Sequence, residues 1–355
     1  MPETPWILRR GSKTRGFRYE RVDGAPVRDR RALERIDALR IPPAWRDVHI
    51  APGPRAAIQA WGYDARGRKQ YRYHGRAIER GELRKFYRVR EMARDLPRIR
   101  ERLERDLRRR EPTREKIAAG VVRLITEGFF RVGGERYAKE NRTFGITTLR
   151  KSHVEVEGDC VVFTYVGKRA KDQWQVVVNR RLAAFVEAMQ RVPGPRLFRY
   201  RDGAGRWRDL TAREVNEYLH ETLGLPYTAK DFRTWGGTLR LATVLAEMGP
   251  ARSEREAARN VALAVRLVAA ELGNTPAICR KSYVHPMVIA RYVDDAVTID
   301  HFRRRAARDR PRARGASGHA PEEDALIRFL DEYFPERRRR TRTSRGSARG
   351  ATIPA

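Results

Sequence analysis

The chain has 355 residues, and its 77 lysine and arginine residues exceed its 45 acidic residues by enough to give a formal net charge of +32. Hydrophobic residues make up 41%, so a chain of this length can bury the cores of two domains. The charge favours a polyanionic partner, most often nucleic acid, and the lack of an apolar run of spanning length argues against a membrane protein.

Residues 1–83 are predicted to form a small, strand-rich domain. Alternating side chains predict strands at 17–22, 58–63 and 69–73. A helix is expected at 31–39, because the prolines that follow stop it. The third strand alternates tyrosine with arginine, which suits a surface that faces DNA, although an ordinary aromatic-rich strand explains the pattern equally well.

Residues 84–302 are predicted to form a mainly helical domain. The densely charged stretch 81–110 is expected to be a solvated helical connector. Thr113 caps the next predicted helix, which ends at 133–134. The apolar face of this helix is formed by Ile117, Val121, Leu124, Ile125 and Phe129.

Between residues 153 and 178 the apolar period changes to two, which predicts a three-stranded antiparallel sheet within the helical domain. A tight turn at 157–159 and a polar tip at 167–172 separate the strands. The alternating apolar positions are Val154, Val156, Val161, Phe163, Tyr165, Trp174, Val176 and Val178.

Helices account for the rest of this domain. One predicted helix carries Lys230 and Arg233. Another ends at Gly273, a typical helix stop, and a third begins at Thr275 and places Tyr283 about two turns in.

Residues 303–355 are interpreted as a basic C-terminal extension, helical at 322–333 and disordered from 337. The whole pattern predicts an α+β fold. It has a strand-rich N-terminal domain, a mainly helical domain that contains the three-stranded antiparallel sheet, and this extension.

The residue inventory argues against several kinds of chemistry. Two cysteines far apart in sequence, Cys160 and Cys279, predict neither a disulfide framework nor a cysteine metal cluster, and they favour a reducing compartment. No histidine spacing suits a metal, and there is no P-loop or dinucleotide fingerprint. The N-terminus lacks the apolar core of a signal peptide. We therefore expect no metal, no cofactor and no small-molecule substrate, and a cytoplasmic location.

Tyr283 is a candidate covalent nucleophile toward phosphate. A phenol is a poor nucleophile at neutral pH, because its unperturbed pKa is about 10, but nearby cations such as Arg280 and Lys281 favour the phenolate. Those two need not be the catalytic cations, since adjacent helix positions point in different directions. Taken alone, the segment is better explained by a tyrosine that packs near a helix end.

Attack by a tyrosine on a phosphodiester adds negative charge to the phosphate, so it requires fixed cationic donors and an acid for the departing oxygen. Arginine forks suit the first task. The cationic candidates are Arg131, which follows an apolar helix, Arg233, which lies between aromatic residues that could clamp its guanidinium, and Lys168, at the hairpin tip. Asn274 lies at a helix junction, a position that suits directing its side-chain amide toward the phosphate. For each cation alone, a solvated or phosphate-positioning role is the default interpretation.

Together these segments resemble the type IB DNA topoisomerases of bacteria and poxviruses. Residues 130–149 are similar to the family's first catalytic arginine segment, 166–168 to its hairpin lysine, 230–235 to its second arginine motif and 273–283 to its nucleophile segment. Residues 41–45 and 67–73 are similar to its DNA-clamping domain. The likeness covers roughly residues 15 to 295. These motifs are individually loose, but together and in the right order they make a specific signature.

The resemblance implies a role for each of these residues. Tyr283 forms a 3′-phosphotyrosyl bond and frees a 5′-hydroxyl, while Arg131 and Arg233 bind the nonbridging phosphate oxygens. Lys168 is the general acid. Asn274, where poxvirus relatives carry histidine, donates a hydrogen bond to the phosphate. The DNA-contacting positions are Gln70, Tyr71, Tyr73, Tyr137 and Lys230, of which Lys230 also lies close to the reacting group.

The resemblance further implies that a monomer clamps double-stranded DNA, cuts one strand, lets it swivel to relax supercoils, and reseals it without ATP or metal in the bacterial cytoplasm, on the nucleoid. Two alternatives stay open. A tyrosine recombinase shares the order Arg, Lys, Arg, Tyr, but it usually carries His-x-x-Arg where this chain has Lys230 and Arg233, and its N-terminal domain is usually helical. A non-enzymatic basic DNA-binding protein predicts no covalent DNA adduct.

Overall fold

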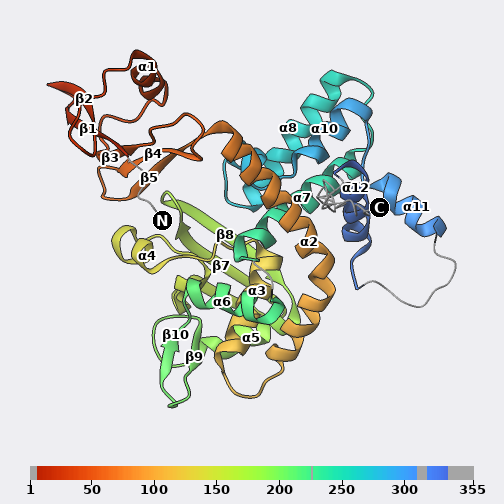
Figure 1. Ribbon diagram of the computed structural model, residues 1–355. Coiled ribbons are helices and arrows are strands. Elements are labelled where there is room, and N and C mark those ends of the chain that lie inside the picture. Colours follow the sequence, from red (N-terminus) through yellow and green to blue (C-terminus); the bar gives the residue numbers. More distant parts are fainter. Residues whose placement is uncertain (1–5, 225–226, 310–317, 335–355) are drawn as a thin grey trace, which may run out of the picture. The chain divides into compact units, whose positions relative to one another are not determined.

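The computed structural model describes residues 6–224, 227–309 and 318–334, and the chain divides into two compact units (Figure 1). Unit 1 is Met1–Phe86 and unit 2 is Tyr87–Ala355. The division falls within the long helix α2 (Gly75–Leu107). The predicted disordered stretch from residue 337 lies outside the described residues.

Unit 1 contains a five-stranded antiparallel sheet and the helix α1 (Arg30–Ala38). Its strands, in the order β2-β1-β3-β4-β5, are β1 (Ile7–Ser12), β2 (Gly16–Arg21), β3 (Arg46–Ile50), β4 (Ile58–Tyr63) and β5 (Lys69–Tyr73). The predicted strands and helix match β2, β4, β5 and α1 to within one residue. Strands β1 and β3 were not predicted, because their few apolar residues do not alternate clearly.

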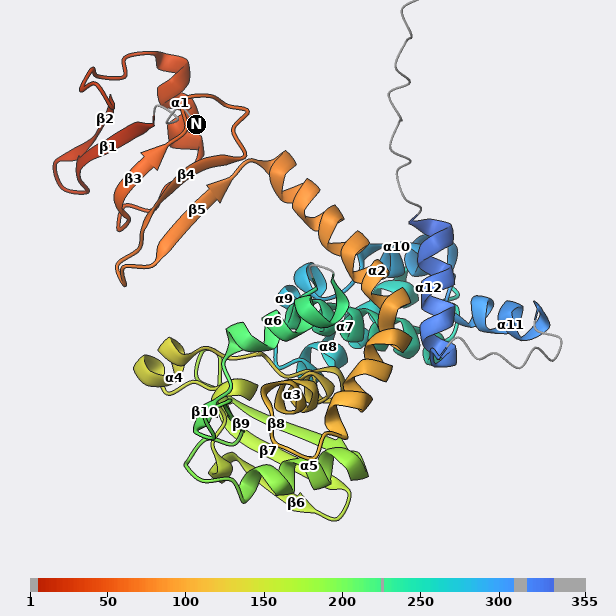
Figure 2. The same ribbon diagram turned by 60° about the horizontal axis from the view of Figure 1, so that its bottom comes forward.

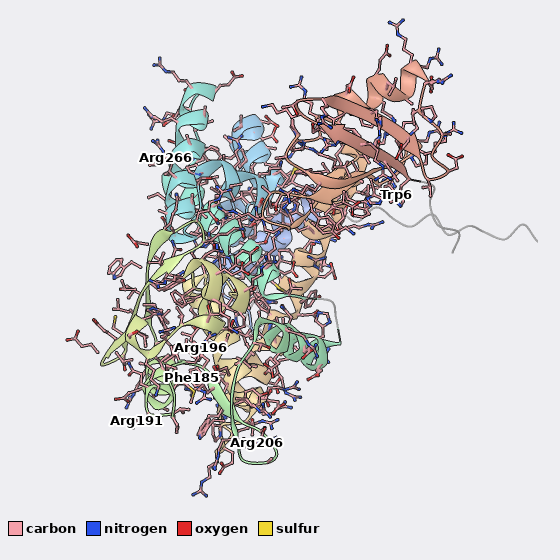
Figure 3. All side chains as sticks on the ribbon, turned by 90° about the vertical axis from the view of Figure 1, so that its left-hand side faces the viewer. Trp6, Phe185, Arg191, Arg196, Arg206 and Arg266 are labelled. Atoms are coloured by element: carbon pink, nitrogen blue, oxygen red, sulfur yellow. The ribbon has the colours of Figure 1, made fainter. Side chains whose placement is uncertain are left out.

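An aromatic and basic surface lies at one edge of this sheet. Tyr71 and Tyr73 are both exposed on the edge strand β5, and their rings stack with centroids 5.7 Å apart. They share a face because residues two apart in a strand point the same way. On β4, Trp61 has the ammonium of Lys69 3.7 Å from its ring centroid and packs edge-on against Trp6, which Figure 3 labels. This surface combines stacking rings with cations.

Unit 2 is mainly helical and has one large hydrophobic core. After α2 its longer helices are α3 (Arg114–Gly128), α5 (Arg180–Gln190), α6 (Ala212–Leu223), α7 (Ala229–Met248), α8 (Glu254–Glu271), α10 (Pro286–Asp295), α11 (Asp300–Asp309) and α12 (Pro321–Tyr333). Shorter elements are α4 (Glu135–Asn141), α9 (Pro276–Ser282), the 3₁₀ turns η1 (Ile146–Thr148) and η2 (Lys151–His153), and the hairpin β9 (Arg199–Arg201) with β10 (Trp207–Asp209). Helix α7, most of whose residues are buried, packs against α3, α8 and α12.

Helix α3 ends earlier than predicted. Its last residue is Gly128, because Phe129 adopts a left-handed conformation with φ 54°. The next residues leave the helix and carry Arg131 toward the end of α8. The early stop therefore frees the segment that bears the first candidate arginine.

The predicted three-stranded sheet is present as β6 (Val154–Glu157), β7 (Cys160–Gly167) and β8 (Lys171–Val178), with α3 and α5 packed against it (Figure 2). The apolar pattern of β8 gives the wrong buried face. Trp174 and Val178 are 72% and 74% exposed, whereas Gln173, Gln175 and Val177 face the core. The reason is the register, which pairs Tyr165 with Gln173 and Phe163 with Gln175. The buried face of β8 therefore follows its partner strand.

Helix α12 belongs to the core of unit 2, although it lies within the predicted C-terminal extension. Leu326, Phe329 and Leu330 are almost completely buried there. Phe329 packs edge-on against Phe302 of α11 with ring centroids 5.6 Å apart. Arg100 of α2 binds Glu323 through two charge-assisted hydrogen bonds of 2.6 and 2.9 Å.

We expect Phe329→Ala to lower the free energy of unfolding of unit 2 by about 3–5 kcal/mol, because it removes a buried ring and leaves a cavity. Denaturant unfolding followed by tryptophan fluorescence measures this loss. The matched control is Arg328→Ala on the exposed side of the same helix, expected to change stability by less than about 0.5 kcal/mol. Equal stabilities of the two variants would contradict the role of α12 in the core.

Among the described residues, no single helix is both long and apolar enough to cross a membrane; only α8 and α9 taken together meet the length and composition limits, and they are bent by 93° at their break.

Candidate active site

The junction between α8 and α9 places Tyr283. Helix α8 ends at the cap residue Leu272, and Gly273 follows with φ +59°, a left-handed conformation that favours glycine. Thr275 caps α9, and its side-chain oxygen accepts a hydrogen bond from the backbone N–H of Ile278. Tyr283 ends this helix, and its own N–H donates to the carbonyl of Cys279 at 2.9 Å.

Helix α7 supports the backbone of Tyr283 from the other side. The Thr238 hydroxyl lies 3.4 Å from the Tyr283 carbonyl oxygen. A Cβ atom at Gly237 would lie 2.9 Å from the same oxygen, so the missing side chain lets helix and tyrosine approach closely. The position of Tyr283 is therefore fixed by contacts to its own main-chain atoms, and these contacts do not involve its side-chain hydroxyl.

Arg233 lies beneath the Tyr283 ring. Its side chain is on α7, the residue is 3% exposed, and the guanidinium carbon lies 5.2 Å from the ring centroid of Tyr283. Its Nη2 donates to the carbonyl of Leu272 at 3.0 Å, while Nε and Nη1 are buried with no hydrogen-bond partner among the described residues. Burial lowers the pKa of Arg233, but an arginine keeps its charge at neutral pH.

A buried cation with unpaired donors is costly unless a partner completes it. Arg233 is therefore prepared to receive an anion next to Tyr283. The sequence-based expectation that neighbouring aromatic residues clamp this guanidinium is wrong. Phe232 and Trp235 instead line a different cavity, and the ring beside the guanidinium is that of Tyr283.

Arg131 reaches the same junction from the segment after α3. Its Nη2 donates to the carbonyl of Gly273 at 2.6 Å and to Oδ1 of Asn274 at 2.7 Å. Its carbonyl accepts from the N–H of Ile146 at 2.8 Å. A Cβ atom at Gly145 would lie 2.6 Å from the Cα of Gly133, so the two segments touch backbone to backbone. Arg131 and Arg233 thus hold neighbouring carbonyls at the end of α8.

Lys168 begins the three-residue turn between β7 and β8, whose last backbone pair is Gly167 with Lys171. Arg169 and Ala170 have φ values of +67° and +54°, which residues other than glycine seldom adopt. The carbonyl of Val166 accepts from the N–H of Phe144 at 2.8 Å, which ties this hairpin to the segment that follows α4. Lys168 is therefore an exposed cation on a turn of constrained shape.

The side chains of Arg131, Lys168 and Tyr283 line one small cleft, which has a volume of about 110 Å³. Small-molecule sites usually measure about 300–1,000 Å³, so this cleft suits a phosphate group better than an organic cofactor. The buried Nδ2 of Asn274 has no hydrogen-bond partner among the described residues and is a further donor. The lining residues are Arg131, Lys168, Arg169, Lys171, Gly273, Asn274, Thr275, Ile278 and Tyr283.

The structure brings together most of the predicted site residues but leaves others apart. Arg131, Lys168, Asn274 and Tyr283 line the cleft, and Arg233 adjoins Tyr283. Lys230 is exposed on the first turn of α7 and does not line the cleft. The remaining predicted DNA contacts are Tyr137, exposed on α4, and Gln70, Tyr71 and Tyr73, which belong to unit 1.

Three residues at the site were missed from the sequence. Arg169 and Lys171 line the cleft, and Gln173 hydrogen-bonds to Arg131. The positions of Arg169 and Lys171 beside Lys168 could have identified them. No sequence signal identifies Gln173, because the hydrophobic pattern of β8 places it on the wrong face.

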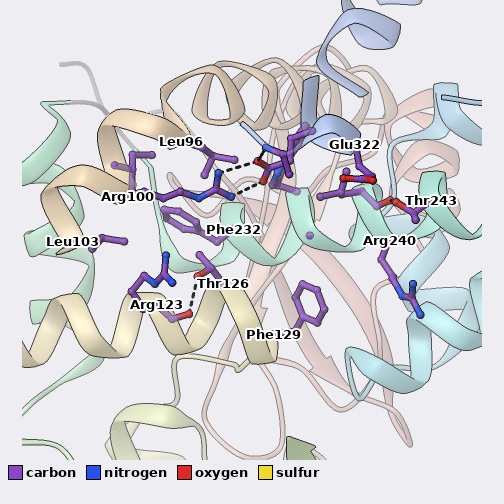
Figure 4. Close-up of a pocket in the computed structure, with 16 residues that line it drawn as sticks. Leu96, Arg100, Leu103, Arg123, Thr126, Phe129, Phe232, Arg240, Thr243 and Glu322 are labelled. Carbon is purple, nitrogen blue, oxygen red and sulfur yellow. Dashed lines mark hydrogen bonds and ion pairs between the residues drawn. The ribbon is translucent and has the colours of Figure 1, made fainter. Parts of the chain in front are cut away.

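A second, larger cavity of about 270 Å³ lies between α2, α3, α7 and α12 (Figure 4). Each arginine that lines it is already paired: Arg100 with Glu323, Arg123 with Glu127, and Arg240 with Glu271. It is mostly apolar and offers no group that would activate a substrate. No cluster of three or more metal-ligating His, Cys, Asp or Glu side chains occurs in the described part of the chain.

Comparison with known proteins identifies relatives of this arrangement. Residues 75–309 match the family described as eukaryotic DNA topoisomerase I, catalytic core, and residues 16–64 match bacterial DNA topoisomerase IB, N-terminal domain. DNA topoisomerase 1B of Acanthamoeba polyphaga mimivirus is 32% identical over 267 residues, which cover 73% of this chain and 80% of the viral protein. DNA topoisomerase I of monkeypox virus and DNA topoisomerase 1B of vaccinia virus (strain Copenhagen) are each 24% identical over 284 residues, covering 75% of this chain and 83% of each relative.

Proposed function

Because this chain belongs to the type IB DNA topoisomerases, we propose that Tyr283 is the residue that cuts and rejoins DNA. Its hydroxyl oxygen attacks the phosphorus of one strand, forms a bond to the 3′ phosphate and displaces the 5′ oxygen. The cut strand then swivels about the intact one, which relaxes supercoils. The 5′-hydroxyl attacks the phosphotyrosine to restore the strand. One phosphoester replaces another at each step, so the bond energy is conserved without ATP.

The observation that carries this proposal is the convergence of Arg131, Lys168 and Asn274 on the cleft that Tyr283 also lines. These residues come from the segment after α3, the β7–β8 turn and the α8–α9 junction. Such a cluster of donors supplies what phosphoryl transfer needs, namely positioning and stabilisation of developing negative charge.

The two arginines and Asn274 bind the nonbridging oxygens in this proposal. Arg233 contributes the unpaired donors Nε and Nη1 beside the Tyr283 ring, and Asn274 contributes Nδ2. An amide does not give up a proton at neutral pH, so Asn274 stabilises the phosphate but does not act as an acid. Lys168 supplies the proton to the 5′ oxygen as it leaves. Lys230, on the same helix as Arg233, contacts the DNA backbone close to the break.

DNA is the partner, and we propose that a monomer of this bacterial-type enzyme clamps duplex DNA in the cytoplasm, on the nucleoid. The stacked, exposed rings of Tyr71 and Tyr73 suit contacts to sugars and bases. Gln70 precedes them on β5 and points to the opposite face of the sheet, where its Nε2 donates to Asp64 at 3.0 Å. Tyr137 is exposed on α4 in unit 2 and offers a similar contact. Cations elsewhere on the surface bind phosphates without regard to sequence.

The assignment is tested by incubating the protein with supercoiled plasmid in buffer containing EDTA and no ATP. We expect relaxation to a ladder of topoisomers. Trapping the intermediate on nicked DNA and mapping the modified peptide should identify Tyr283. A link to any other residue, or strand exchange between two sites without free relaxation, would contradict the proposal.

We expect Arg131→Ala and Arg233→Ala each to slow single-turnover cleavage by about 10²–10³-fold, the usual cost of removing one fixed donor to a transition state. Arg233→Lys is also expected to be slow, because an ammonium lacks the fork that reaches both Leu272 and a phosphate. The matched control is Arg240→Ala, further along α7 and paired with Glu271 at the surface. Cleavage by the arginine variants at the rate of this control would refute their roles.

A further inference from the structure

A buried glutamine connects the β7–β8 hairpin with the α8–α9 junction. Gln173 on β8 is 6% exposed, and its Oε1 accepts a hydrogen bond from Nη1 of Arg131 at 3.2 Å. Its Nε2 donates to the carbonyl of Asp172 at 2.9 Å and to that of Lys171 at 3.3 Å. One side chain therefore touches the first catalytic arginine and the backbone of the strand that follows the Lys168 turn.

The chemistry of its neighbours fixes the orientation of this amide. Arg131 has only donors, so the oxygen of Gln173 must face it, and the two carbonyls accept only from the nitrogen. A flipped amide would set N–H against N–H and oxygen against oxygen. All the hydrogen-bond partners of Gln173 thus require the same orientation of its side-chain amide.

Two glycines make room for this side chain. A Cβ atom at Gly273 would collide with Oε1 of Gln173, and a Cβ at Gly167 would overlap its Cγ. Gly273 belongs to the nucleophile junction and Gly167 to the end of β7. The close packing holds Gln173 between the two segments that bear Asn274 and Lys168.

We propose that Gln173 is a positioning residue that sets the orientation of the Arg131 guanidinium for phosphate binding. The proposal rests on the function assigned above to Arg131. An arginine has five N–H donors, and its contacts to Gln173, Gly273 and Asn274 use three of them. Gln173 binds Nη1, whereas the other two partners bind Nη2. With both nitrogens held, the guanidinium cannot rotate, and its free N–H groups face in a fixed direction.

The test compares Gln173→Met with Gln175→Met. Methionine keeps the length of glutamine and removes both hydrogen-bonding groups. Gln175 lies two residues further along the same strand and face, is 8% exposed, and bonds Tyr165 at 2.7 Å and Gly128 at 2.9 Å, away from the cleft. Both variants lose a buried amide, but only one loses a contact to Arg131.

In single-turnover cleavage of nicked DNA, we expect Gln173→Met to be about 10–100-fold slower than wild type, the scale of a small misplacement of a catalytic group. Gln175→Met should cleave at a rate within about 3-fold of wild type, because it does not misplace a catalytic group. Melting temperatures measure the loss of stability, which should be similar in the two variants. If Gln173→Met does not fold, Gln173→Asn replaces it, because this shorter amide cannot reach Arg131.

Two further measurements separate positioning of Arg131 from a general structural effect. In an Arg131→Ala background, Gln173→Met should slow cleavage by less than about a further 3-fold, because the contact between Gln173 and Arg131 is already absent. Combined with Lys168→Ala, its effect should multiply in full. A wild-type rate for Gln173→Met, an undiminished effect without Arg131, or an equal loss in Gln175→Met would overturn the proposal.

The same assay distinguishes failure of this inference from failure of the proposed function. If the wild-type protein forms an adduct at Tyr283 and Arg131→Ala is slow, the function stands and the glutamine variants decide the inference. If Arg131→Ala cleaves at the wild-type rate, the assigned role of Arg131 fails, and the inference fails with it.

Discussion

Tyr283→Phe is expected to lower the rate of covalent cleavage by at least about 10⁴-fold, because it removes the attacking oxygen and nothing nearby replaces it. The change should leave the fold intact. Tyr283 is held through its N–H and carbonyl, and its ring can still pack over Arg233. DNA affinity should therefore stay close to that of wild type, and the loss should appear in the chemical step alone.

The measurement is the formation of a protein–DNA adduct on a nicked substrate, with affinity determined separately by gel shift. Tyr292→Phe is the matched control. Tyr292 is 1% exposed, and its hydroxyl donates to the carbonyl of Gly249 at 2.9 Å and accepts from Asn260 at 2.8 Å, but it lies outside the cleft. This control should lose stability and keep the cleavage rate. An adduct formed by Tyr283→Phe would show that another residue is the nucleophile.

The sequence predicts the fold where local chemistry and packing agree. The helix capped by Thr113 and the helix capped by Thr275 begin where predicted, because caps and apolar stripes act over a few residues. The turn at Lys168 is also where the polar tip predicts it. The buried face of strand β8 is wrongly predicted, since Trp174 and Val178 resemble a core face in sequence and lie in solvent.

The assembly of the site depends on contacts between segments far apart in sequence. Arg131 meets Gly273 and Asn274 across more than 140 residues, and Arg233 meets Leu272 and Tyr283. Periodicity does not predict such contacts. Local sequence makes these residues weak candidates among many cations, and their likeness to a family selects them together. Gln173 lies outside any such motif, and its role depends on the register of β8 and on two glycines.

Lys168→Ala is expected to slow cleavage by about 10²–10⁴-fold, the usual contribution of a general acid. The leaving 5′ oxygen departs as a strongly basic alkoxide unless it gains a proton. The cleft places the exposed Lys168 on the same small surface as Tyr283 and Arg131. A DNA substrate with sulfur in place of the bridging 5′ oxygen tests this role, because a thiolate, with a pKa near 8.5 for its thiol, leaves without protonation.

On the sulfur substrate we expect Lys168→Ala to recover most of its lost rate, whereas Arg131→Ala and Arg233→Ala stay slow, since they act on the nonbridging oxygens. Arg169→Ala and Lys171→Ala are the matched controls, because both cations line the same cleft. They should weaken DNA binding and its salt dependence without any sulfur-specific recovery. Equal losses of Lys168→Ala on the oxygen and sulfur substrates would assign Lys168 to charge stabilisation, and the proton would then have to come from another group at the cleft.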